Sequence, residues 1–113
     1  GSGEAMGVAV SLSRLIYLTS YRHDLEFRIQ LINQARMGLL NFVNDLMNVG
    51  TDMDPDSPEV KQMEQRKQRL QLIDKQLDQE LQQYQAKLET TTAEIQKVKQ
   101  DMQTNIKMSY GGG

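Results

Sequence analysis

The sequence contains no cysteine and no tryptophan, and only two of its 113 residues are proline. Without cysteine, disulfides and thiolate metal sites are excluded. Aromatic residues make up only 5% of the chain, which leaves few large side chains for a broad globular core. Few prolines, together with many Gln, Leu, Lys and Glu residues, favour long helices over a mixed fold.

Strong net charge and long apolar runs are missing as well. The formal net charge of −2 is too near neutral to predict a nucleic-acid partner. No apolar run approaches the ~18–20 residues that span a bilayer, so we expect no membrane partner. Arg14 interrupts the one apolar stretch that resembles a signal peptide. We therefore expect a cytoplasmic protein, or one secreted without a cleavable signal peptide.

The chain divides into a short N-terminal segment and one helical-hairpin domain. Residues 1–5 are typical of a cloning remnant, and residues 6–113 are expected to form the single domain. The pattern predicts a first helix over about residues 10–48, a turn over 49–57 and a second helix over about 58–108.

The turn carries its own boundary signals. Ser57, Pro58 and Glu59 are typical of an N-cap, a first helical position and an acidic first turn, respectively. Gly50 supplies the stop signal for the preceding helix. A turn this short requires the two helices to run antiparallel.

Both predicted helices carry a seam of residues spaced alternately by three and four, which is the spacing of a coiled coil. In the first helix the seam comprises Leu15, Leu18, Arg22, Leu25, Ile29, Ile32, Arg36, Leu39, Val43 and Leu46. In the second it comprises Val60, Met63, Lys67, Leu70, Asp74, Leu77, Leu81, Tyr84, Leu88, Thr91, Ile95, Val98 and Met102. The predicted fold is all-α: two long antiparallel helices in a coiled-coil hairpin, packed in a larger oligomeric bundle.

Placing the turn near Asp54 aligns the two seams in layers. The expected neighbours are Leu46 with Val60, Val43 with Met63, Ile29 with Leu77, Leu25 with Leu81, and Leu18 with Leu88. This alignment puts Arg36 one layer from Asp74. We expect the two to pair, because an unpaired charge in a seam is costly.

A second apolar stripe lies to one side of the first-helix seam, and the opposite side is polar. The predicted assembly interface on this stripe consists of Phe27, Leu31, Ala35, Phe42 and Val49. A two-helix hairpin buries only one stripe per helix, so the second stripe needs another partner, most economically another copy of the chain. In the alternative, Phe27 and Phe42 wrap onto the second helix and the chain stays monomeric.

The polar residues form no complete metal-binding or catalytic motif. Asp52, Asp54 and Asp56 resemble the start of a calcium-binding loop, but Ser57 and Met63 stand where glycine and glutamate are required. A solvated turn with capping carboxylates fits better. His23, the one histidine, has no second ligand or nucleophile beside it. We therefore predict no catalytic residue, metal or cofactor, and no enzyme activity.

The turn Pro55-Asp56-Ser57-Pro58 between two amphipathic helices resembles that of the needle subunits of type III secretion systems. The resemblance implies a hairpin subunit that packs helically into an export-linked filament, although this second helix is longer. The first hypothesis is a non-enzymatic, self-associating coiled-coil structural subunit. The alternative is a coiled-coil adaptor or chaperone-like protein of the cell interior that binds a helical protein partner through its first helix.

Overall fold

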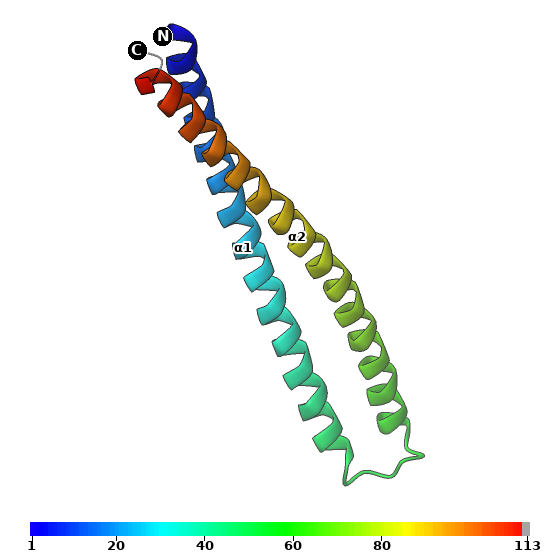
Figure 1. Ribbon diagram of the computed structural model, residues 1–113. Coiled ribbons are helices and arrows are strands. Elements are labelled where there is room, and N and C mark those ends of the chain that lie inside the picture. Colours follow the sequence, from blue (N-terminus) through cyan, green and yellow to red (C-terminus); the bar gives the residue numbers. More distant parts are fainter. Residues whose placement is uncertain (112–113) are drawn as a thin grey trace. The chain divides into compact units, whose positions relative to one another are not determined.

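The computed structural model describes residues 1–111 and shows an all-α helical hairpin. Helix α1 spans Ser2–Gly50 and helix α2 spans Pro58–Gly111, and no strand occurs in this part of the chain (Figure 1). The all-α helical hairpin predicted from the two heptad seams is confirmed, because both helices form and one short turn joins them.

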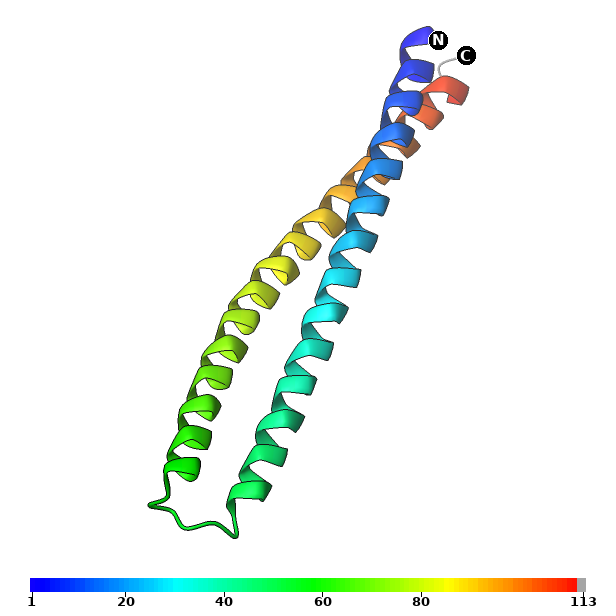
Figure 2. The same ribbon diagram turned by 180° about the vertical axis from the view of Figure 1, so that it is seen from behind.

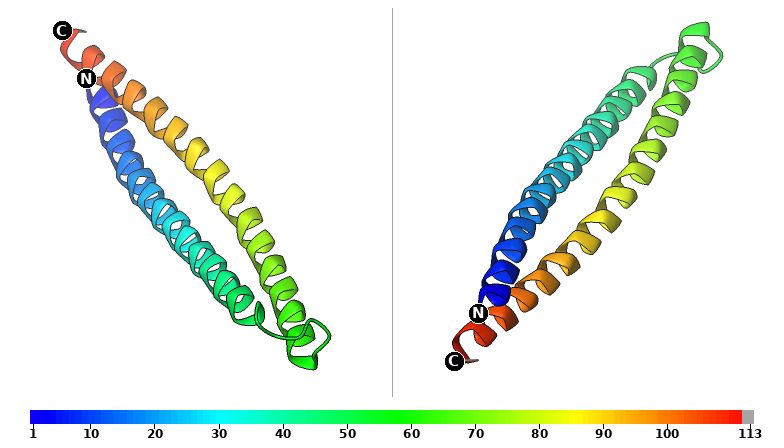
Figure 3. Two further views of the ribbon diagram at one scale, coloured as in Figure 1. Left: turned by 90° about the horizontal axis from the view of Figure 1, so that it is seen from below. Right: turned by 90° about the horizontal axis from the view of Figure 1, so that it is seen from above.

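The hairpin consists of two compact units. The terminal unit contains Gly1–Phe27 together with the chain from Tyr84 onward, and the turn unit contains Arg28–Gln83. Within the terminal unit, the first part of α1 lies beside the last part of α2 (Figures 1 and 2). Within the turn unit, the end of α1 lies beside the start of α2 and runs antiparallel to it (Figure 3).

The terminal unit is built on a small apolar cluster. Leu18, Ile95 and Val98 are buried together, and Leu15 packs against them. The seam therefore places Leu18 against Ile95 rather than in a layer with Leu88, which corrects the predicted alignment. The apolar spacing repeats along both helices, so a displaced alignment still brings apolar side chains together.

Thr91 is the buried polar residue of this seam. Its hydroxyl donates a hydrogen bond of 2.7 Å to the carbonyl oxygen of Lys87, one turn earlier in α2. The hydroxyl is thus paired within its own helix, although it is buried in the seam.

Helix α1 begins at Ser2, well before the predicted start near residue 10. Glu4 lies in the first turn, where a carboxylate is favoured, and it forms an ion pair of 2.8 Å with the N-terminal ammonium group. This ion pair lowers the pKa of Glu4. The residues expected to be a cloning remnant therefore take part in the helix. At the other end, α2 continues to Gly111 rather than ending near residue 108.

Hydrogen bonds of the turn account for both helix boundaries. The Thr51 hydroxyl donates to the carbonyl oxygen of Met47 and satisfies one of the last carbonyls of α1. Asp54 accepts the backbone N–H of Asp56 on its side chain and that of Ser57 on its carbonyl oxygen. The Ser57 hydroxyl then accepts the N–H of Val60 at 3.3 Å, which confirms the predicted N-cap of α2.

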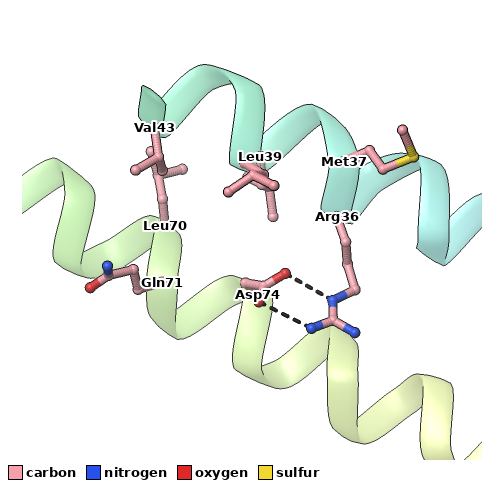
Figure 4. A pocket seen from close by; sticks show the side chains of 8 residues that line it. Arg36, Met37, Leu39, Val43, Leu70, Gln71 and Asp74 are labelled. Carbon is pink, nitrogen blue, oxygen red and sulfur yellow. Dashed lines mark hydrogen bonds and ion pairs between the residues drawn. The ribbon is translucent and has the colours of Figure 1, made fainter. Parts of the chain in front are cut away.

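In the turn unit, Ile32 and Leu81 are the buried apolar residues. Val43 and Leu70 line one groove of this unit (Figure 4). Met63 lies close to Gly50. Both observations fit an alignment that places Arg36 directly opposite Asp74.

Candidate functional site

Arg36 of α1 and two carboxylates of α2 form the main polar site of the turn unit. The Nε and Nη2 atoms of Arg36 donate to the two carboxylate oxygens of Asp74 at 2.9 and 3.2 Å (Figure 4). The Nη1 atom donates to Oδ1 of Asp78 at 2.9 Å. The predicted pairing of Arg36 with Asp74 is therefore present, in the same layer rather than one layer apart. Asp78 lies one turn beyond Asp74, and the sequence analysis missed its part in the site.

This geometry stabilises the charged forms of both partners. The hydrogen bond from Arg36 lowers the pKa of Asp74, although partial burial of the carboxylate acts in the opposite direction. The same hydrogen bond raises the pKa of Arg36. Since all three side chains keep contact with water, the site contributes chiefly to the alignment of the two helices and less to overall stability.

A charge exchange tests this alignment. We expect Asp74→Lys to lower the urea midpoint of unfolding, because it places an ammonium group beside the Arg36 guanidinium. Adding Arg36→Glu is expected to restore part of that loss, because the pair is re-formed with its signs exchanged. Circular dichroism of the two single variants and the double variant measures the coupling.

The control is Asp52→Lys, which makes the same charge change in the exposed turn. We expect it to leave the midpoint nearly unchanged. Additive effects of the Arg36 and Asp74 substitutions would show that the pair does not set the alignment in solution.

The residues predicted for the seam are all at least partly removed from solvent. Those that are buried are Leu18, Leu25, Ile32 and Leu81, and those that are half-buried are Ile29, Leu39, Val43, Leu70, Leu77, Tyr84 and Leu88. The seam therefore accounts for the interior of the hairpin and leaves the rest of the surface of α1 to be explained.

The residues predicted for the assembly interface remain open to solvent. Leu31 and Phe42 are each 47% exposed, and Ala35 and Val49 are exposed too, all within the turn unit. Phe27 is exposed in the terminal unit. The alternative, in which Phe27 and Phe42 wrap onto α2, is not what the structure shows. We call Leu31, Ala35, Phe42 and Val49 the phenylalanine flank of the turn unit.

A second set of exposed apolar side chains was missed by the sequence analysis. Met37, Leu40 and Met47 lie on the other side of the seam of α1, and 65%, 61% and 50% of their respective surfaces are exposed. They occupy the heptad positions that flank a coiled-coil seam, which was the signal that could have revealed them. We call these three residues the methionine flank.

A groove lies between the methionine flank and α2. It has a volume of about 440 Å³ and is lined by Met37, Leu40, Leu39, Val43 and Leu70, with Arg36, Gln71 and Asp74 at its polar side. Leu39, Val43 and Leu70 project into the space between the helices, whereas Met37 stands at its margin (Figure 4). The site thus combines an apolar floor with one ion-paired edge.

Residues 1–111 contain no group of three or more His, Asp or Glu side chains placed to hold a metal ion. His23 is exposed and lies 3.8 Å from a carboxylate oxygen of Glu26 in the next turn. Over the described helices, no segment has the length and apolar character needed to cross a membrane.

Comparison of the chain with protein-family models, with curated proteins and with solved structures yields no match. The exposed face of α1 and the groove beside it are therefore the features of the described residues that bear on function.

Proposed function

We propose that this chain is a non-enzymatic coiled-coil structural subunit that associates with copies of itself through α1. The observation that carries the proposal is the distribution of the exposed large apolar side chains. Within residues 1–111, α1 carries Met6, Val10, Leu12, Ile16, Tyr17, Phe27, Leu31, Met37, Leu40, Phe42, Met47 and Val49, whereas α2 carries only Leu72, Ile73, Ile106, Met108 and Tyr110.

Physical chemistry supports an assembly in which this face is covered. Contiguous apolar surface on a monomer is unfavourable, and single scattered residues would need no explanation. Here the residues recur along one helix at spacings that keep them on common faces. A hairpin of two helices also has only a narrow seam of its own, and small domains gain stability by association.

The turn Pro55-Asp56-Ser57-Pro58 supports a more specific form of the proposal, an export-linked filament. Its resemblance to the turn of type III secretion needle subunits concerns four residues and the hairpin around them. A filament subunit needs an apolar face on the helix that is interior to the assembly and a polar helix outside. The contrast between α1 and α2 fits that division.

The second candidate is an adaptor that offers α1 to a different helical protein. The same exposed face favours it, since an apolar helix surface is a common docking site for an amphipathic helix. The two candidates differ in the state of the purified chain. A structural subunit associates on its own, whereas an adaptor keeps one small size at all concentrations until its partner is added.

Analytical ultracentrifugation over a wide concentration range, with electron microscopy of the same samples, tests the proposal. We expect the wild-type chain to grow in mass with concentration, and the single variants Leu31→Asp and Phe42→Asp to sediment as much smaller species, because a carboxylate would have to be buried. The matched control is Gln34→Asp, at an exposed position of the polar face. A wild-type chain that stays monomeric, or variants that sediment like it, would overturn the proposal.

A further inference from the structure

We propose that Arg36, Asp74 and Asp78 form a latch that holds the turn end of the hairpin closed, and that neutralising the two carboxylates opens this end while the terminal unit stays folded. The turn end is defined here as residues 36–80, which lie within the turn unit. The inference goes beyond the proposed function, because the latch acts within one chain and does not depend on self-association.

The first argument is that the turn end has no buried core. The structure describes all of residues 36–80, and none of them is buried. The seam side chains here are half-buried, and three of them, Leu39, Val43 and Leu70, line an open groove (Figure 4). Burial of apolar surface is the main force that holds helices together. Apolar packing therefore closes this end less firmly than it closes the terminal unit, where Ile95 is completely buried.

The second argument is the set of hydrogen bonds that joins the two helices at this place. Arg36 of α1 donates two hydrogen bonds to Asp74 and one to Asp78, both on α2 (Figure 4). Asp78 also accepts a hydrogen bond of 3.0 Å from Gln82, which helps to hold its carboxylate in position. Hydrogen bonds between ionised partners are stronger than those between neutral groups. The latch thus supplies directional contacts in a segment without buried side chains.

The third argument is that the latch arginine depends on these two carboxylates for its counter-charge. It is the one charged residue in residues 32–40 of α1. In residues 70–82 of α2, the other charged residues are Lys75 and Glu80, and both are exposed. Neutralising the two carboxylates would leave the guanidinium half-buried in the seam without a counter-charge, which is unfavourable. Opening the turn end returns the guanidinium to water.

Acid is therefore expected to open the turn end. The hydrogen bond from Arg36 lowers the pKa of Asp74, so this carboxylate stays charged from neutral pH down to about pH 4. Its contribution to closure is present over that range and is lost as the pH falls through the lowered pKa. Opening exposes the seam side chains that line the groove and joins them to the methionine flank in one apolar surface.

Spin labels on introduced cysteines test the inference, since the chain has no cysteine of its own. The turn pair consists of Asn44→Cys and Gln68→Cys, and the terminal pair consists of Ser13→Cys and Lys99→Cys. All four positions are exposed. Double electron–electron resonance measures the distance within each pair, and an excess of unlabelled chain suppresses distances between copies.

The latch variant carries Asp74→Asn and Asp78→Asn, which remove both charges with little change in size. At neutral pH we expect the distances of the turn pair to lengthen and broaden in this variant, and those of the terminal pair to stay as in the wild type. The control carries Asp45→Asn and Asp52→Asn, which remove two exposed carboxylates of the same unit. We expect the control to leave both pairs unchanged.

Acid titration of the wild type and of Arg36→Leu gives a second test. Between about pH 7 and about pH 3 we expect the turn pair of the wild type to lengthen. In Arg36→Leu we expect no further lengthening in acid, because protonation no longer removes the counter-charge of an arginine. A latch variant with wild-type distances in the turn pair would overturn the inference. Equal lengthening of both pairs would overturn it too, because it would indicate unfolding of the whole hairpin.

Discussion

Ile95→Ala is expected to lower the free energy of unfolding by about 3 kcal/mol, within the range typical of a large apolar side chain replaced by alanine in a core. Ile95 is the one fully buried large side chain of the described residues, with 0% of its surface exposed. It sits in the cluster with Leu18 and Val98, and the substitution leaves a cavity among them. Urea unfolding followed by circular dichroism at one fixed chain concentration measures the change.

Ile16→Ala is the matched control, because it makes the same chemical change in the terminal unit at a side chain that is 61% exposed. In dilute solution we expect it to change the free energy of unfolding by no more than about 0.5 kcal/mol. If Ile95→Ala were no more costly than Ile16→Ala, the observed cluster would not be the core of the terminal unit.

Ile32→Ala is expected to lower the free energy of unfolding by about 2–3 kcal/mol, for the same reason but in the turn unit. Ile32 is 7% exposed and is the most deeply buried residue of α1 in this unit. Because groups in a marginally stable chain open locally before the whole molecule unfolds, native-state hydrogen exchange is the more informative measurement. We expect the amides of residues 28–50 to exchange faster in the variant.

Ile73→Ala serves as the control for this unit, since Ile73 is 43% exposed on α2. We expect it to leave the exchange rates of residues 28–50 close to those of the wild type. Equal acceleration by both substitutions would show that the burial of Ile32 is not what protects the backbone of the turn unit.

The heptad pattern was sufficient to predict the all-α hairpin and its turn. Alternating spacings of three and four determine which side of each helix faces the other helix. This holds along the whole length of the pattern. Ser57 and Pro58 added a local boundary signal, which the hydrogen bond to Val60 confirms. These features depend on neighbouring residues in the sequence, and that is why the sequence alone could predict them.

It was harder to predict which seam residues of α1 face which seam residues of α2. The apolar pattern repeats, so sliding one helix along the other by one repeat brings apolar residues together again. Val43 meets an apolar partner whether it faces Met63 or Leu70. Only a residue that breaks the pattern can distinguish the two alignments, and Arg36 is such a residue. Its partner was predicted correctly, but the layer was taken to be one step away.

The methionine flank was missed for a different reason. Met37 and Leu40 are separated in the sequence by the seam residue Leu39 and are followed by polar Asn41, so the side of the helix that carries them was read as polar. Their exposure became visible only when the position of α2 was known. The early start of α1 was also missed, because Gly1–Ala5 lacks the periodic pattern on which the helix prediction depended.

The two carboxylates that share Arg36 also determine what a slide of one helix along the other would cost. Asp78 follows Asp74 by one helical turn, so a slide of α2 by about 5.4 Å in one direction would bring Asp78 to the place of Asp74 and preserve a charged partner. The same slide in the other direction would bring Leu70 to the place of Asp74 and Asp74 to the place of Asp78, so the guanidinium again keeps one of its two carboxylates. Within the turn unit, the observed position is therefore the one in which both carboxylates bind the arginine, and a slide by one turn in either direction gives up one of them.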